Sequence, residues 1–79
     1  MDYKKFKNYK GIEYMATFYN GILHSYNDKP AIIWNDKLNT KEWYNFGLRH
    51  RSNNNPAYEN KILKEWWYND KKIKIKYLN

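Results

Sequence analysis

The sequence predicts an all-β fold, an antiparallel meander of short repeat-derived hairpins that forms one curled sheet or a small open barrel. Three observations carry this prediction. Short runs of alternating apolar and polar residues recur along the 79 residues, and turn-forming residues separate these runs. In addition, two segments of the chain share one spacing of Gly, His and Pro-Ala. The sequence shows no convincing helix.

The length is that of a single small domain. We divide it into a basic N-terminal arm, residues 1–11, and one β-hairpin-repeat domain, residues 12–79. The arm has two interpretations: a partly frayed segment, or one helical turn that Phe6 and Tyr9 pin onto the domain.

Charge and aromatic content are the marked features of the composition. The net charge is +7, aromatic residues make up 20% of the chain, and there is no cysteine. A few large aromatic side chains can build the core of a short chain, and the positive charge favours an acidic partner. Because no long apolar run and no signal-peptide pattern is present, we expect a cytoplasmic protein that does not bind membranes.

The first strand of the domain is predicted at residues 12–19, where apolar and polar side chains alternate. Asn20-Gly21 follows, and it predicts a type I′ hairpin turn because both central residues of that turn need a positive φ. Residues 22–24 begin the return strand. Pro30 opens the next strand, residues 30–34, at a position where no ladder N–H has to be supplied.

The same pattern continues to the end of the chain. The strand at residues 40–46 leads to Gly47, which opens the second turn. Three consecutive asparagines at 53–55 predict a loop. The remaining strands, separated by polar turns, are predicted at 48–50, 57–59, 62–68 and 72–77. Strands that follow one another in sequence usually pair, which favours a meander.

Two segments of the chain share one spacing. In each, a glycine is followed after three residues by a histidine, and a Pro-Ala pair begins six residues after that histidine. The repeated positions are Gly21, His24 and Pro30 in the first copy and Gly47, His50 and Pro56 in the second. A repeated spacing indicates architecture before chemistry, so we expect structural roles for these six residues.

The second copy, residues 41–51 followed by Pro56-Ala57, resembles the short W-Y-x-x-G-x-x-H-R-x-x-x-x-P-A hairpin repeat of uncharacterised phage and giant-virus proteins, which is distantly MORN-like. The resemblance covers residues 12–78. The first copy has Thr17-Phe18 in place of Trp-Tyr, and the last unit keeps Lys64-Glu65-Trp66 but lacks the Gly, His and Pro. It implies a hairpin array with atypical terminal units and, by analogy, contacts with proteins or lipids.

Neither the histidines nor the repeated glutamates favour catalysis. His24 and His50 lack further metal ligands and a nearby nucleophile, so we expect their rings to bond backbone carbonyls of the loops that follow. Glu42 and Glu65 both stand in Lys-Glu-Trp. A glycosidase pair is one interpretation, but equivalence in a repeat favours cross-strand pairing with Lys or Arg. We predict no enzymatic activity, no metal and no cofactor.

The candidate binding residues are cations and aromatics of the C-terminal half: Arg49, Arg51, Trp66, Trp67, Tyr68, Lys71, Lys72, Lys74 and Lys76. An arginine pair can hold phosphate or carboxylate, and tryptophans either stack on bases or fill the core. Alternation predicts that Trp66 and Trp67 face opposite sides, one in the core and one exposed. It also predicts one face for Lys72, Lys74 and Lys76, which either contacts phosphates or protects a sheet edge from aggregation.

These features predict a protein that acts by docking on a macromolecule. The main hypothesis is a small phage- or virus-like accessory protein that binds and inhibits a host protein, such as a CRISPR effector nuclease, in the host cytoplasm. One alternative is binding of nucleic acid or a nucleotide signal. The other is a structural virion or scaffold protein that forms homo-oligomers through its sheet edges.

Overall fold

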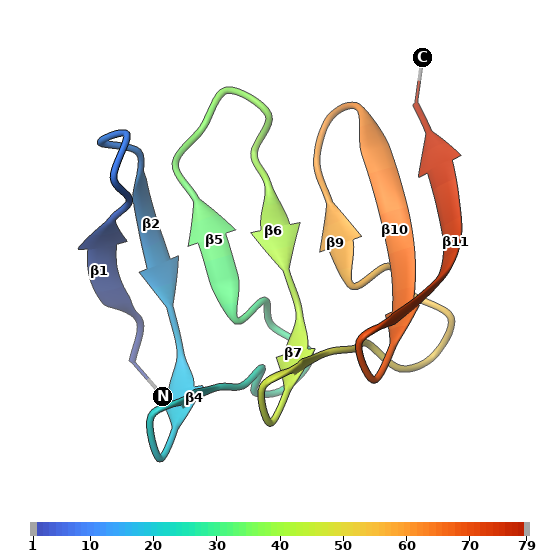
Figure 1. The fold of residues 1–79 in the computed structure, drawn as a ribbon, viewed down its shortest axis with the longest axis horizontal. Helices are drawn as coiled ribbons and strands as arrows, with labels where there is room; N and C mark the ends of the chain where they lie inside the picture. The colour runs from blue at the N-terminus through green and yellow to red at the C-terminus, as the bar shows by residue number, and fades with distance from the viewer. Residues whose placement is uncertain (1, 79) are drawn as a thin grey trace.

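The computed structural model describes residues 2–78, and this part of the chain consists of strands joined by turns and loops, with no helix (Figure 1). The main sheet has seven antiparallel strands in the spatial order β1 (Lys4–Lys7), β2 (Glu13–Ala16), β5 (Ile32–Trp34), β6 (Lys41–Glu42), β9 (Tyr58–Glu59), β10 (Leu63–Tyr68) and β11 (Lys71–Tyr77). The all-β meander is confirmed. The sheet is open, with β1 and β11 as its edges, and does not close into a barrel.

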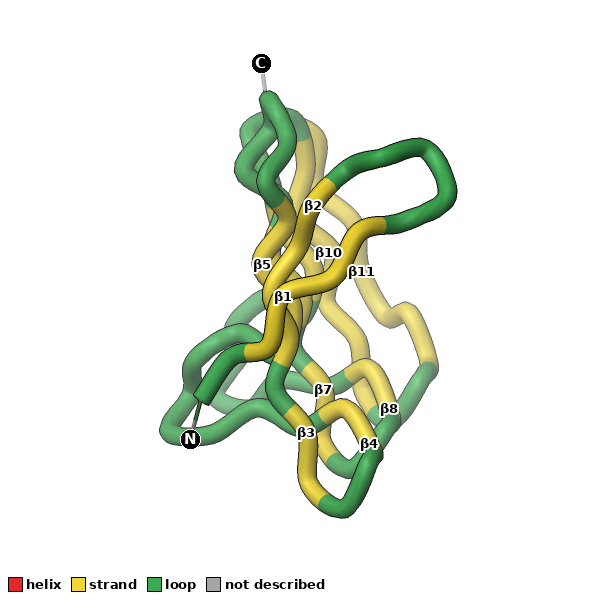
Figure 2. The backbone as a smooth tube through the Cα atoms, turned by 90° about the vertical axis from the view of Figure 1, so that its left-hand side faces the viewer, coloured by secondary structure: helices red, strands yellow, loops and turns green. Residues whose placement is uncertain are grey.

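Two small hairpins complete the fold. They are formed by β3 (Phe18–Tyr19) with β4 (Ile22–Leu23), and by β7 (Tyr44–Asn45) with β8 (Leu48–Arg49). Figure 2 shows both hairpins at the same end of the main sheet. The described part of the chain contains no helix with the length and hydropathy needed to cross a membrane.

The basic arm contributes an edge strand. β1 pairs with β2, and the ring of Phe6 stacks on that of Tyr14 with centroids 5.3 Å apart. The helical-turn interpretation is therefore wrong, because the alternation of residues 4–7 turns Phe6 toward an aromatic neighbour and leaves lysines exposed. Tyr9 is 92% exposed and does not pin the arm.

Two of the predicted strands are interrupted by a single residue. Residues 12–19 divide at Thr17, and residues 40–46 divide at Trp43. Two consecutive residues are buried at each break, which the alternating faces of a straight strand do not allow. The chain bends there, and the N–H of Trp43 donates to the carbonyl oxygen of Ala57 at 2.7 Å. The bend separates each small hairpin from the main sheet.

Three equivalent tight turns close the hairpins β3–β4, β7–β8 and β10–β11, the last of which we call the last hairpin. Their central pairs all have positive φ, as a type I′ turn requires: Asn20-Gly21, Phe46-Gly47 and Asn69-Asp70. The turn predicted at Asn20-Gly21 is confirmed. Gly47 is the second central residue of its turn rather than the first, and a Cβ there would lie 2.9 Å from Cγ2 of Ile22 in the preceding hairpin. Neighbouring hairpins are therefore packed closely.

Candidate functional site

The two repeated histidines join one hairpin to the next. Nδ1 of His24 accepts a hydrogen bond from the N–H of Phe46 at 3.0 Å, and Nδ1 of His50 accepts one from the N–H of Asn69 at 3.3 Å. Both donors are the first central residue of the next turn. The bonding partner thus differs from the loop carbonyl that the sequence suggested, because the hairpins stack side by side and present their turn N–H groups to the rings.

The two repeated prolines lie at the entrances to the next strands. Pro56 is buried and Pro30 is half-buried. The carbonyl oxygen of Pro30 accepts a hydrogen bond from the Tyr3 hydroxyl at 2.7 Å, and that of Pro56 accepts one from Arg51 at 3.1 Å. These contacts tie the arm to the first repeat loop, and the second repeat loop to an arginine of the same repeat.

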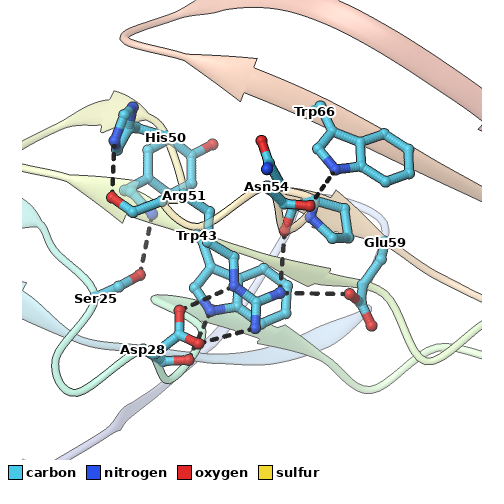
Figure 3. Close-up of polar contacts among 11 residues, drawn as sticks. Ser25, Asp28, Trp43, His50, Arg51, Asn54, Glu59 and Trp66 are labelled. Carbon is cyan, nitrogen blue, oxygen red and sulfur yellow. Dashed lines mark hydrogen bonds and ion pairs between the residues drawn. The ribbon is translucent and has the colours of Figure 1, made fainter.

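Arg51 is held by an acidic residue of the first repeat and a tryptophan of the second (Figure 3). Its Nε and Nη2 donate to the two carboxylate oxygens of Asp28 at 2.9 and 3.2 Å. Its Cζ lies 3.8 Å from the ring centroid of Trp43, and Nη1 lies 3.6 Å from Oε1 of Glu59. The indole N–H of Trp43 donates to the backbone oxygen of Asp28 at 3.0 Å. We call Asp28, Trp43 and Arg51 the inner clasp.

The inner clasp neutralises the charge of Arg51. The hydrogen bond that Arg51 donates to Asp28 lowers the pKa of the Asp28 carboxyl group. The side chain of Arg51 is only 15% exposed. A guanidinium that is stacked on one face and paired with a carboxylate has few free donors for an external ligand.

A related arrangement lies at the last hairpin. The indole N–H of Trp66 donates to the backbone oxygen of Asn54 at 2.9 Å, as Figure 3 shows. Nζ of Lys74 lies 4.6 Å from the ring centroid of Trp66. We call Asn54, Trp66 and Lys74 the outer clasp. It repeats the inner clasp with an amide in place of the carboxylate and a lysine in place of the arginine.

A buried ionic network is centred on Glu42. Its carboxylate accepts hydrogen bonds from Nε1 of Trp34 at 2.7 Å, the hydroxyl of Tyr44 at 2.7 Å and Nη2 of Arg49 at 2.5 Å. The guanidinium of Arg49 also lies 5.0 Å from the ring centroid of Trp67. Because this buried carboxylate is paired with a cation and accepts hydrogen bonds from three residues, its role is structural.

The last hairpin repeats this network in a more exposed form. Nε1 of Trp67 donates to Oε1 of Glu65 at 2.8 Å, and Nζ of Lys72 lies 3.8 Å from Oε2 of the same residue. Glu42 and Glu65 thus make equivalent contacts with their own hairpins, in the manner expected of repeat positions.

A β-bulge separates the cations of β11. Trp66 is opposite Lys74 but Trp67 is opposite Lys72, which leaves Ile73 without a cross-strand partner. Because the extra residue reverses the alternation, Lys72 lies on the face of Trp67 while Lys74 and Lys76 lie on the face of Trp66. The prediction of one face for these three lysines is wrong. Both tryptophans are half-buried, so the prediction of one core and one exposed ring is wrong as well.

The nine predicted binding residues therefore fall into three groups. The ionic networks contain Arg49, Trp67 and Lys72. The inner clasp contains Arg51. The other five predicted residues lie on the face of the last hairpin that is opposite Trp67 and Lys72. One lysine that was not predicted from the sequence lies on the same face. We call this set the basic face: Lys64, Trp66, Tyr68, Lys71, Lys74 and Lys76.

The missed residue, Lys64, lies directly opposite Lys76. Its position two residues before Trp66 in the same strand was a signal that could have identified it. None of the four lysines of the basic face has an ion pair within residues 2–78, where the carboxylate partners of cations are Glu42, Asp28, Glu59 and Glu65.

A polar hollow of about 230 Å³ lies beside the inner clasp and is lined in part by His50 and Ser52. Oγ of Ser52 is 3.4 Å from Nε2 of His50, and Nδ1 of the same ring is occupied by a backbone N–H. A serine nucleophile needs a closer base that a third group orients. Within residues 2–78, no three metal-binding side chains gather.

The network around Glu42 changes the pKa of Tyr44, and this change can be measured by titration. Burial, and then the charge of Glu42, raise the pKa of Tyr44 from 10.0 to about 12. A raised pKa means that folding favours the neutral phenol, so this stabilisation is complete below pH 10 and is lost as the pH rises toward 12. Two pKa units correspond to about 2.7 kcal/mol of folding stability. The contribution of Tyr44 is smaller than this, because its side chain is only half-buried and solvent screens its interactions.

We expect one tyrosinate absorbance step at high pH that Tyr44→Phe removes, and a fall in urea stability above pH 10 that the variant shows less strongly. Tyr19→Phe, at an exposed ring, is the control. An unchanged alkaline titration in Tyr44→Phe would contradict this assignment.

The chain was compared with protein-family models, with curated proteins and with solved structures, and no match was found in any of the three.

Proposed function

We propose that the protein is a non-enzymatic binding module that docks on an acidic protein surface through the basic face. The observation that supports this is the contrast among its cations. Arg49, Arg51 and Lys72 are held by carboxylates, whereas the lysines of the basic face surround Trp66 and Tyr68 without such partners in the described chain. Lysines at a rim speed association, and Trp and Tyr are typical centres of binding energy.

We further propose that the partner is a host protein and that binding inhibits it. The protein would then be a phage- or virus-like accessory protein, and a CRISPR effector nuclease is one target of this kind. The proposal is supported by the small size of the chain and by the resemblance of residues 41–51 to phage and giant-virus repeats.

The chain offers a matched test of the basic face. Lys71, Lys74 and Lys76 on β11 are changed together to glutamine, and the control variant changes Lys4, Lys5 and Lys7 on β1. Each variant removes three charges from an exposed edge strand. In a pull-down from host lysate, we expect the β11 variant to lose the captured partner and the β1 variant to retain it. Equal recovery with both variants, or no partner above background, would contradict the proposal.

Nucleic-acid binding is the second candidate. It is favoured by Tyr68, which is 60% exposed and lies beside lysines that have no ion pair in the described part of the chain. Tryptophan fluorescence titrated with a single-stranded oligonucleotide at about 50 mM and 200 mM salt separates the two functions. Quenching that collapses at the higher salt supports nucleic acid, and a flat signal at both salts removes it.

Edge-to-edge self-association is the least favoured by charge. The edge strands β1 and β11 are both rich in lysine, and pairing them places like charges opposite one another.

A further inference from the structure

The inner and outer clasps have the same backbone geometry. Asp28 and Asn54 are 26 residues apart in the repeat, and their φ angles are 60° and 59°. The backbone oxygen of each accepts an indole N–H from the tryptophan of the next unit, at 3.0 and 2.9 Å. Arg51, which follows β8, lies over the ring of Trp43, and Lys74 of β11 lies over the ring of Trp66. The two sites share this backbone geometry and differ in their side chains and in their burial.

One of these differences is the carboxylate of the residue that accepts the indole hydrogen bond. In the inner clasp, Asp28 neutralises the cation that lies on the ring. In the outer clasp, Asn54 occupies the same backbone position, and Lys74 has no ion pair within residues 2–78. Both Asn54 and Lys74 are exposed, so the position that the Asp28 carboxylate fills in the inner clasp is accessible from outside in the outer clasp.

We propose that the outer clasp is a carboxylate-binding site that takes an Asp or Glu side chain of the acidic partner. This inference rests on the proposed function and names the contact that anchors it. The ammonium group of Lys74 pairs with the carboxylate, the face of Trp66 holds the lysine in place, and the amide of Asn54 supplies a hydrogen-bond donor.

A carboxylate is favoured over a phosphate because the inner clasp provides the precedent. The group that completes the inner clasp is a carboxylate, and it reaches the cation from the loop that carries the indole acceptor. A phosphate backbone would instead bind the lysines of the basic face as separate point charges, with no special part for the outer clasp.

The substitution Asn54→Asp supplies the missing carboxylate from within the chain. Asp28 shows that aspartate is accepted at this backbone geometry. The probe is a poly-glutamate peptide at about 50 mM salt, and binding is followed by the Trp66 indole N–H resonance, assigned with Trp66→Phe. We expect Asn54→Asp to weaken peptide binding about tenfold, because its own carboxylate occupies the site.

The neighbouring substitution Asn53→Asp is the matched control. It adds the same charge in the same loop, at an exposed residue with positive φ, but outside the clasp. We expect it to weaken binding by less than about threefold through general charge alone. Lys74→Gln should weaken binding as Asn54→Asp does, and the double variant should lose little more, because both changes remove one interaction.

The outcomes separate this inference from the proposed function. Equal effects of Asn54→Asp and Asn53→Asp overturn the carboxylate site, while loss of binding in the triple β11 variant would still support the basic face. If the wild-type protein does not bind poly-glutamate, both are overturned. If a single-stranded oligonucleotide of equal charge shifts the Trp66 indole resonance more than the peptide does, the site binds phosphate and the inference fails.

Discussion

Glu42→Ala is expected to destabilise the protein by about 3–5 kcal/mol. The glutamate side chain is 8% exposed and accepts hydrogen bonds from three residues. Its removal leaves the charge of Arg49 half-buried, and Nε of that arginine already has no hydrogen-bond partner. A domain of 79 residues has a free energy of unfolding of about 4–12 kcal/mol, so this one substitution removes a large part of it. Urea denaturation followed by tryptophan fluorescence measures the loss.

Two further variants test whether charge is the cause. Replacing both Glu42 and Arg49 with leucine should restore only part of the stability. An apolar pair leaves no unpaired buried charge, but the indole N–H of Trp34 and the hydroxyl of Tyr44 lose their acceptor.

Glu65→Ala removes the equivalent glutamate of the last hairpin. Its partner Lys72 is 45% exposed and 3.8 Å away, so the ion pair contributes less than about 1 kcal/mol. With the hydrogen bond from Trp67, which contributes about 1 kcal/mol, the whole loss should be about 2 kcal/mol. Equal losses for Glu42→Ala and Glu65→Ala would contradict the distinction between a buried and an exposed network.

Local sequence signals were enough to predict the fold class. Alternation and the Asn20-Gly21 turn act over a few residues, and each is present in the structure as a strand or a tight turn. The break at Trp43 could not be predicted in this way. Alternation assigns Glu42 and Trp43 to opposite faces, but both are buried, because the chain bends where the small hairpin leaves the sheet.

The candidate site was harder to predict because its cations look alike in sequence. Arg51 and Lys74 both lie near a tryptophan, but within residues 2–78 only Arg51 of the two has an ion pair. Its bidentate carboxylate partner, Asp28, stands 23 residues earlier in the chain. The bulge at Ile73 is a second cause. A single extra residue moves Lys72 to the other face of the hairpin, and nothing in an alternating Lys-Ile pattern marks where the alternation is interrupted.

The second large effect is expected at Trp43, which is 4% exposed. Trp43→Ala should cost about 3–5 kcal/mol, because it opens a cavity and removes the aromatic surface on which Arg51 lies. It also removes the indole donor to Asp28. The first and second repeats are joined through these contacts, so we expect the loss to appear as a lower urea midpoint with a changed slope if the repeats begin to unfold separately.

Trp66→Ala provides the matched comparison. Trp66 occupies the equivalent place in the outer clasp, but it is half-buried and lies on β10, next to the edge strand β11, so its removal opens a smaller cavity. We expect a loss of about 1–2 kcal/mol. Trp43→Phe keeps an aromatic ring, though a smaller one, and should cost less than Trp43→Ala. About 1 kcal/mol of its loss comes from the missing indole hydrogen bond, and the rest comes from the space that the smaller ring leaves. If Trp43→Ala and Trp66→Ala unfold at the same urea concentration, the inner clasp does not couple the repeats. If Trp43→Ala unfolds at a much lower urea concentration than Trp66→Ala, the inner clasp contributes more to stability than the outer clasp.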